Sequence, residues 1–325
     1  MTQGDKPRRG ARLRWEMPMN ANVLEAIKRS AAVPSVPQVV MRFLEVIQDP
    51  NFEYDDLVKA LSADPGTVSE ILRLTNSALF GVSQQVTSLR QALTLLGPKR
   101  TRSLVLGRYL VESLGEQTAP ELDPSYFWRR SLATAVLAAR LADTVAPRLR
   151  EEVFISALLA DIGIPVLAQA LPEQYHPIVS RYTPHGTPFS DEEEHQAVEV
   201  THGEVSAMVL THWGLPEHIC TAVNCHHAQV TGEDPPALLA RLIGASDRIA
   251  KLLCEIPDVD QAAPVCAEAT ATVGVGLERL CTILGEIEQD IEELAIILRI
   301  DVIPSTVYTM IAKAVQEKLA APAAT

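Results

Sequence analysis

The chain has 325 residues, of which 47% are hydrophobic and 21% are charged. This is enough apolar material for one large or two modest cores, and the composition excludes global disorder. The formal net charge of −13 repels phosphate backbones, so nucleic-acid binding would need a local basic patch. We find no apolar run that approaches the roughly 18 to 20 residues needed to span a bilayer and no secretory signal, which predicts a cytoplasmic protein.

Two basic clusters interrupt this acidic composition. They are Lys6, Arg8, Arg9, Arg12 and Arg14 in the first cluster, and Arg90, Lys99, Arg100, Arg102 and Arg108 in the second. Neither cluster has the interleaved aromatic residues that are typical of a nucleic-acid site. We therefore interpret the first as a flexible tail and the second as a solvated helix face.

The five cysteines show no pattern of a disulfide framework. Their number is odd, and no two of them form a C-x-x-C pair. This usage fits a reducing compartment. We expect buried or inert thiols.

From residue 20 onwards, apolar residues recur at spacings of three and four, and no segment sustains an alternation of period two. This pattern predicts helices throughout and an all-α fold. Residues 1–18 lack it and are expected to form a flexible basic tail.

Capping residues place several helix boundaries in the first half of the chain. Asp64 stands before a proline at the first helical position, which is typical of a helix start. Ser88 begins a second helical segment, and Gly97, followed by a proline, ends it. The stretch 115–125 contains prolines that a continuous helix would not tolerate, so we place a boundary between two lobes there.

The second half of the chain shows three further features. Residues 181–195 combine proline and glycine signals with an acidic run and are expected to form a solvated loop. Thr201 and Glu204 have the spacing of a capping box at the start of a helix. Beyond residue 256, the pattern predicts two or three amphipathic helices that pack on the core or on a partner.

A series of short motifs occurs in a fixed order between Ser30 and Ala228. They are Pro34 and Pro37, Asp64-Pro65, Asn76-Ser77, Phe80-Gly81, Ala92, Leu96-Gly97, the segments FWRRSLATA, ALLADIG and THGEVSAMVLTHWGLPEHI, and the pair His226-His227. This order resembles the HDOD family, the output-domain relatives of HD metal phosphohydrolases. The resemblance implies a two-lobed, HD-like helical fold and a role in bacterial signal transduction.

The resemblance also suggests a domain organisation. Residues 19–255 would form the HDOD domain, with an N-terminal lobe at 19–115 and an HD-like lobe at 116–255, and residues 256–325 a C-terminal helical extension. Asn76 lies late in an apolar helix, where its side chain is expected to bond local backbone groups or to join the lobes.

An HD-type centre needs histidines and carboxylates that converge from separate helices, because they must hold a cation and lower the pKa of its attacking water. By the resemblance, the early histidine of that set falls at Arg130, and the His-Asp doublet falls at Ala160 and Asp161. Two ligands are therefore missing. The residual metal candidates are Asp161, His202, His226, His227 and Asp247. We expect a degenerate site and assign no catalytic or cofactor-binding residue.

Arg130 brings a permanent positive charge close to the expected metal position. At roughly 5 Å and an effective dielectric near 20, its repulsion of a divalent ion is on the order of 6 kcal/mol. Without a cation, the buried carboxylates of Asp161 and Asp247 would be left unpaired, which is costly. We therefore predict that Arg130 replaces the metal as a structural link and pairs with Asp161 through its forked guanidinium.

These observations favour a non-catalytic regulatory module that acts through contacts with other signalling proteins, and a second copy of the chain is a further candidate partner. No cofactor, membrane or nucleic-acid partner is expected. Two alternatives stay open: a metal-dependent phosphohydrolase that uses the residual site, and a nucleotide-sensing domain in which Arg130 holds a phosphate. Stoichiometric metal together with phosphatase activity would favour the enzyme.

Overall fold

The computed structural model describes residues 21–30, 32–49, 51–77, 84–115, 119, 121–255, 259–298 and 305–320. Every regular element within these ranges is a helix, which confirms the predicted all-α fold. The predicted tail at 1–18 and the first residues of the extension, 256–258, lie outside the described residues.

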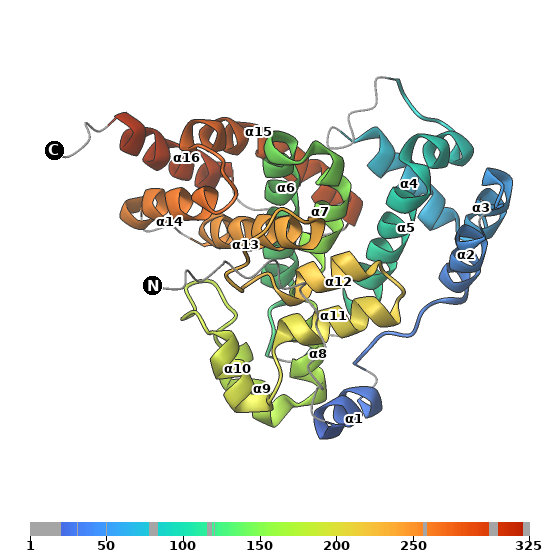
Figure 1. Cartoon of the computed structure of the whole chain (residues 1–325), viewed down its shortest axis with the longest axis horizontal. Helices are drawn as coiled ribbons and strands as arrows, with labels where there is room; N and C mark the ends of the chain where they lie inside the picture. Colours follow the sequence, from blue (N-terminus) through green and yellow to red (C-terminus); the bar gives the residue numbers. More distant parts are fainter. Residues whose placement is uncertain are drawn as a thin grey trace, which may run out of the picture.

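Of the N-terminal helices, all but the first lie together on one side of the molecule, and the first lies apart from them (Figure 1). They are α1 (Ala21–Arg29), α2 (Gln38–Gln48), α3 (Tyr54–Leu61), α4 (Pro65–Asn76) and α5 (Leu89–Gly115). Asp64 caps α4 as predicted, because its carboxylate accepts hydrogen bonds from the backbone N–H groups of Gly66 at 2.9 Å and Thr67 at 3.3 Å. At Gly97 the backbone has φ of 74°, so the predicted helix end is a kink between two helical parts of α5.

Asn76 closes the connection between α4 and α5. Its side-chain amide donates to the carbonyl oxygens of Leu72 and Val86, each at 2.8 Å, and its oxygen accepts from the Val86 backbone at 2.7 Å. The expected bonding to local backbone groups is confirmed.

The middle of the molecule contains the second set of helices. They are α6 (Pro124–Val145), the 3-10 turn η1 (Pro147–Leu149), α7 (Arg150–Leu158), α8 (Gly163–Ala170), α9 (Pro172–Val179), α10 (Asp191–Val198), α11 (His202–His212), α12 (Glu217–Asn224) and α13 (Pro235–Cys254). The long helix α6 packs against α7 and α13, in the centre of Figure 1. Alanines such as Ala133, Ala135 and Ala138 are fully buried on α6, and their small side chains let these helices approach closely.

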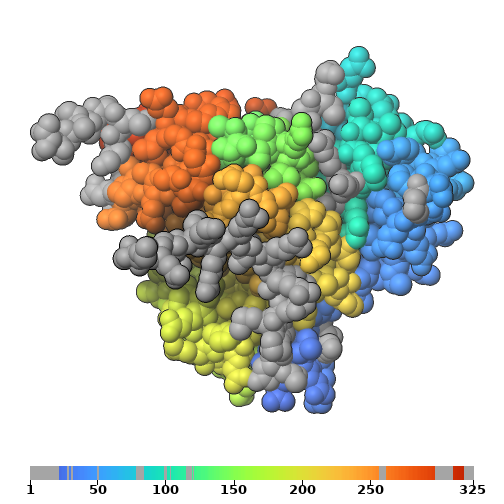
Figure 2. Space-filling view, viewed as in Figure 1, coloured from blue at the N-terminus to red at the C-terminus, as the bar shows by residue number. Residues whose placement is uncertain are grey.

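Three helices follow: α14 (Val259–Ala271), α15 (Leu277–Leu298) and α16 (Ser305–Ala320). They lie away from α2 and α3 (Figure 2), whereas α15 packs against both α6 and α4. Leu280 and Ile283 on α15 are fully buried, and Arg140 of α6 pairs with Asp290 of α15 at 2.5 Å between Nη2 and Oδ2. These helices therefore pack on the core, which is one of the two arrangements that the sequence predicted.

The stretch Pro147–Ala170 corrects the expectation that no apolar run approaches the length needed to span a bilayer. By length and composition it could cross a membrane, with a mean hydropathy of 1.9, but 89% of its apolar window is buried inside the protein. The structure breaks it into η1, α7 and α8. Its apolar character reflects the core that these helices share with α6 and α11.

Part of the second basic cluster is less solvated than expected. Arg108 is only 11% exposed and forms ion pairs with Glu70 and Asp64, and Arg90 pairs with Asp55. The side chains of Lys99 and Arg100 lie outside the described part of the chain. Arg108 thus joins α5 to α4, and Arg90 joins α5 to α3.

All five cysteines are free, as expected. Cys220, Cys254 and Cys266 are buried, and burial raises the pKa of the Cys254 thiol to about 12. Such thiols are poor nucleophiles.

Candidate functional site

A cavity of about 470 Å³ lies beside α6, α13 and the loop that joins α9 to α10. Its lining includes four of the five residual metal candidates together with Arg130; these residues are Arg130, Asp161, His202, His227 and Asp247. The fifth candidate, His226, is buried next to Asp161. The structure therefore brings all of the predicted site residues to one place.

Arg130 donates two parallel hydrogen bonds to the carboxylate of Asp247. Its Nε donates to Oδ1 at 2.9 Å and its Nη2 to Oδ2 at 2.8 Å. The side chains are 13% and 8% exposed, so this is a largely desolvated pair. Burial would lower the pKa of Arg130, but the charge of Asp247 raises it well above its usual value. The guanidinium is therefore permanently charged.

The predicted partner of Arg130 was wrong: it pairs with Asp247 and not with Asp161. Asp161 is occupied by other groups. Its Oδ1 lies 3.2 Å from Nε2 of His226 and 3.6 Å from Nε2 of His202, and its Oδ2 accepts from the hydroxyl of Tyr182 at 3.2 Å. Burial would raise the pKa of Asp161, but the contact with His226 and the nearby positive charges hold it well below its usual range.

Three histidines gather around Asp161. Nε2 of His202 and Nε2 of His227 are 3.1 Å apart, and the rings of His226 and His227 have centroids 3.9 Å apart. His202 and His226 are buried, whereas His227 is exposed as a residue although its ring faces the other two. One ligand atom from each of Asp161, His202, His226 and His227 lies within 4.8 Å of all the others, so these four residues fit a single transition-metal ion.

Glu194 fixes the orientation of His202. Its carboxylate lies 2.7 Å from Nδ1 of His202, accepts from the His202 backbone at 3.0 Å and also accepts from the hydroxyl of Tyr175. Burial would lower the pKa of His202, but the charge of Glu194 and then that of Asp161 raise it to about 9. Carboxylates that hold the far nitrogen of a ligand histidine are a common feature of metal sites.

Sequence reasoning missed Glu194, because the acidic run 181–195 was expected to be solvated. In the structure Ser190 and Glu193 form a capping box at the start of α10. Glu194 on this helix points inward, and its side chain is 0% exposed. The capping-box spacing at these two positions was the available signal for a helix. The burial of Glu194 depends on contacts with α9 and α11 that the local sequence does not contain.

Two glycines let the backbone of the histidines approach neighbouring helices. A Cβ placed on Gly163 would lie 2.0 Å from the carbonyl oxygen of His202, and one on Gly244 would lie 2.2 Å from that of His226. Any larger residue would push these segments apart. The glycine in the motif ALLADIG is therefore required by the packing of α8 against the start of α11.

The loop between α9 and α10 covers the cavity from one side. Arg181 holds the loop in place. Its Nε donates to the carbonyl and hydroxyl oxygens of Thr187, and its Nη1 pairs with Oε1 of Glu193 at 2.7 Å. Phe189 of this loop meets the ring of His202 edge-on, with centroids 6.2 Å apart. The loop thus belongs to the candidate site, which the sequence did not predict.

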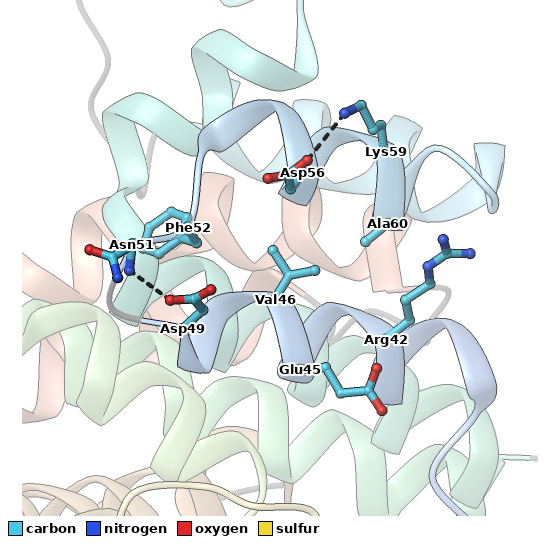
Figure 3. Close-up of a pocket in the computed structure, with 9 residues that line it drawn as sticks. All are labelled: Arg42, Glu45, Val46, Asp49, Asn51, Phe52, Asp56, Lys59 and Ala60. Atoms are coloured by element: carbon cyan, nitrogen blue, oxygen red, sulfur yellow. Dashed lines mark hydrogen bonds and ion pairs between the residues drawn. The ribbon is translucent and has the colours of Figure 1, made fainter.

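A second hollow, of about 370 Å³, lies between α2 and α3. Figure 3 shows Arg42 and Lys59 at one end and Asp49 with Asn51 at the other. Its lining contains no histidine or cysteine. Among the described residues, the groups that could hold a metal ion lie around His202 instead, so we place the candidate site in the larger cavity.

A family model described as the HDOD domain matches residues 33–229, which is more than half of the 325 residues. The chain belongs to the HDOD family. The match covers the cavity from Arg130 to His227, and Asp247 lies beyond its end.

Similar proteins have been described in several bacteria. An uncharacterised protein of Treponema pallidum (strain Nichols) is 25% identical over 230 residues, which are 66% of this chain and 43% of that protein; the chain thus spans less than half the length of this relative. A candidate phosphohydrolase from Shewanella amazonensis SB2B has a similar structure, with a TM-score of 0.67 and 21% identity over 86% of this chain and 100% of that one.

A third similar structure is that of a candidate signal transduction protein from Marinobacter aquaeolei VT8. It has a TM-score of 0.53 and 18% identity, covering 91% of this chain and 65% of that one. At these identities the likeness establishes the HDOD fold of the chain, and the function must be argued from its own site.

Proposed function

We propose that this HDOD protein is a non-catalytic, cytoplasmic regulatory module that acts through contacts with other signalling proteins. The observation that carries the proposal is the forked ion pair between Arg130 and Asp247. One structural neighbour, described as a candidate signal transduction protein, is consistent with this role.

The ion pair argues against hydrolysis because it occupies groups that a hydrolytic centre would need. Both oxygens of Asp247 accept from Arg130, so neither is free for a cation. A hydrolytic metal centre must also keep an open position for an attacking water. Ala160 offers no ligand beside Asp161. On this side of the site, the charged guanidinium of Arg130 takes the place of a metal cation.

The regulatory role needs a surface for partners. Among the described residues, the large hydrophobic side chains exposed to solvent are Met41, Leu95, Ile296 and Met310. Ile296 is 72% exposed on α15, and Met310 lies on the neighbouring helix α16. Methionine is enriched at protein contacts and α15 packs against α16, so we assign the partner surface to these two C-terminal helices.

The test uses the full chain as bait in native lysate. A double variant Ile296→Glu with Met310→Glu should lose a specific protein partner, because charged groups there would have to be desolvated. The matched variant Met41→Glu with Leu95→Glu carries the same change on the first lobe and should retain it. Equal retention by both variants would contradict the assigned surface.

A metal-dependent phosphohydrolase is the second candidate, and the cluster of Asp161 with three histidines is the observation that favours it. It predicts phosphate release that requires a bound metal and that His202→Ala abolishes. The regulatory proposal predicts no release above that of the His202→Ala variant.

A further inference from the structure

The outer face of α15 carries an acidic hollow. One face of this helix packs Ile283, Ile287 and Leu294 into the core. On the other face, a hollow of about 550 Å³ opens beside α6. Its lining sets one arginine of α6 against four carboxylates of α15. These residues are Arg140, Glu286, Glu288, Asp290 and Glu292.

Only one of the four carboxylates is neutralised. Arg140 donates from Nε to Oδ2 of Asp290 at 2.6 Å and pairs with the same oxygen through Nη2 at 2.5 Å. Within the described part of the chain, the three glutamates of the hollow form no ion pair. The hollow therefore keeps an excess of negative charge that the chain itself does not balance.

The spacing of these charges is unfavourable for the helix that carries them. Glu288 and Glu292 stand four residues apart on α15, where like charges repel one another across one helical turn. On the neighbouring helix α16 the same spacing joins opposite charges, Lys313 and Glu317, at 3.8 Å. A cationic partner over α15 would relieve the repulsion.

Gly285 gives an independent indication of a partner at the same place. It lies within α15 and lines the hollow, although glycine makes a helix less stable than alanine does. Its φ is not positive, and a Cβ added to it would meet nothing within 4 Å. The packing of the chain therefore does not require a glycine here, whereas the close approach of another backbone would.

An exposed apolar side chain continues this face toward the end of the helix. Ile296 is 72% exposed and lies four residues beyond Glu292, which places the two side chains on the same face. At roughly 1.5 Å per residue, Glu286 and Ile296 are about 15 Å apart along the axis. The face thus presents negative charge, a flat position at Gly285 and then an apolar contact.

We infer that the face of α15 from Gly285 to Ile296 binds an amphipathic helix of a partner protein, with basic residues over the hollow and an apolar residue against Ile296. The inference deepens the proposed regulatory function and rests on it. Amphipathic helices bind grooves through anchors at helical spacing, and complementary charge selects the partner and fixes its register. About ten residues of helix cover the span of 15 Å.

Two other occupants fit the charges less well or are separated by the test. A second copy in a two-fold contact places the same patch against itself, so the unbalanced glutamates would face one another. The chain's own N-terminal segment carries the basic residues Lys6, Arg8, Arg9, Arg12 and Arg14. A variant of that segment therefore belongs in the experiment.

The test measures fluorescence anisotropy of a labelled synthetic peptide with the full-length protein. The peptide is an amphipathic helix of about 18 residues, long enough to be helical alone, with lysines and leucines on one face. A control peptide of the same composition places them on opposite faces. We expect saturable binding of one peptide per chain, weaker at high salt and about 10-fold tighter than that of the control. No saturable binding, or equal binding of the two peptides, would overturn the inference.

Charge variants test whether the hollow, and not the net charge of the protein, attracts the peptide. Glu286→Gln with Glu292→Gln should weaken binding by roughly 10-fold. Glu45→Gln with Glu173→Gln makes the same change of charge at exposed positions on α2 and α9 and should bind as the unmodified protein does. Equal loss in the two double variants would assign the binding to non-specific attraction.

Gly285→Gln tests the close approach. Because nothing lies within 4 Å of an added Cβ, the melting temperature should not fall, whereas filling the hollow should weaken peptide binding by roughly 10-fold. Unchanged affinity would contradict the docking geometry.

Arg8→Gln with Arg12→Gln tests the chain's own basic segment. This double variant should bind the peptide as the unmodified protein does. Tighter binding would identify that segment as the occupant of the hollow and overturn the inference of a separate partner.

The outcomes separate this inference from the proposed function. If the peptide does not bind, but Ile296→Glu with Met310→Glu still loses its cellular partner, the partner chemistry is wrong and the regulatory role stands. If the peptide binds with the expected variant effects, but His202→Ala abolishes a metal-dependent phosphate release, the regulatory role is wrong and the peptide site stands.

Discussion

The guanidinium of Arg130 holds both carboxylate oxygens of Asp247, with Nε to Oδ1 at 2.9 Å and Nη2 to Oδ2 at 2.8 Å. The pair joins α6 to α13 in the wall of the 470 Å³ cavity. It places a fixed positive charge beside a cluster of histidines.

Arg130→Ala should lower the free energy of unfolding by about 3 to 5 kcal/mol, because it leaves the buried carboxylate of Asp247 unpaired. Denaturant unfolding measures the change. The matched control is Arg29→Ala, which breaks an ion pair with Glu25 whose side chains are 77% and 60% exposed and should cost less than about 1 kcal/mol.

The double variant Arg130→Met with Asp247→Leu removes both charges and keeps similar volume. Its stability should lie much closer to that of the unmodified protein than that of Arg130→Ala does, because no buried charge is left alone. A double variant as unstable as Arg130→Ala would mean that the loss comes from packing and not from the unpaired carboxylate.

Gly163→Ala should destabilise the protein by roughly 1 to 3 kcal/mol, as overpacking does, because the added Cβ would lie 2.0 Å from the backbone oxygen of His202. Gly285→Ala is the control. That glycine lies within α15 with nothing within 4 Å of an added Cβ, so the substitution should stabilise its helix by about 0.5 to 1 kcal/mol. Thermal unfolding of the two variants should shift in opposite directions.

The stability of the fold should depend on pH through Asp64, which caps α4. Burial would raise the pKa of Asp64, but hydrogen bonds from Thr67 and Tyr109 lower it from 3.8 to about 2. A carboxyl with a lowered pKa in the folded state adds stability above pH 3.8 and loses it as the pH falls to about 2. Asp64→Asn keeps a capping oxygen without the charge, so its stability deficit should shrink across this window. A deficit that is constant with pH would contradict the assignment.

The C-terminal helices should be held by the pair of Arg140 with Asp290, whose carboxylate is 2% exposed. Burial raises the pKa of Asp290 despite its bond to Arg140, so removing the arginine favours its neutral form. Arg140→Ala should destabilise the fold by about 3 kcal/mol or more and should increase amide hydrogen exchange along α15. Unchanged exchange there would show that apolar packing alone holds these helices.

The helix boundaries could be predicted because they are set locally. Asp64 and Thr201 cap helices through groups two or three residues away, and Gly97 bends α5 through its own φ angle. The partner of Arg130 could not be predicted in this way. Asp161 and Asp247 both lie within the former centre, and the choice depends on the relative placement of α6, α13 and the turn after α7.

Glu194 is a second residue whose place in the site could not be predicted from the local sequence. It belongs to a run of acidic residues, which usually lies on a solvated face. Its burial follows from the contacts of α10 with α9 and from the donors on His202 and Tyr175. Residues that hold a site from outside are placed by tertiary contacts, so a motif of ligand residues does not reveal them.

The central claim, a regulatory module without hydrolytic activity, is tested most directly by phosphate release from the full-length protein. The protein is loaded in turn with Mn²⁺, Fe²⁺ and Zn²⁺ and assayed on mononucleotides and cyclic dinucleotides beside its His202→Ala variant. We predict equal, background release from both proteins under every condition. Metal-dependent release that is lost in His202→Ala would contradict the claim and identify the protein as a phosphohydrolase.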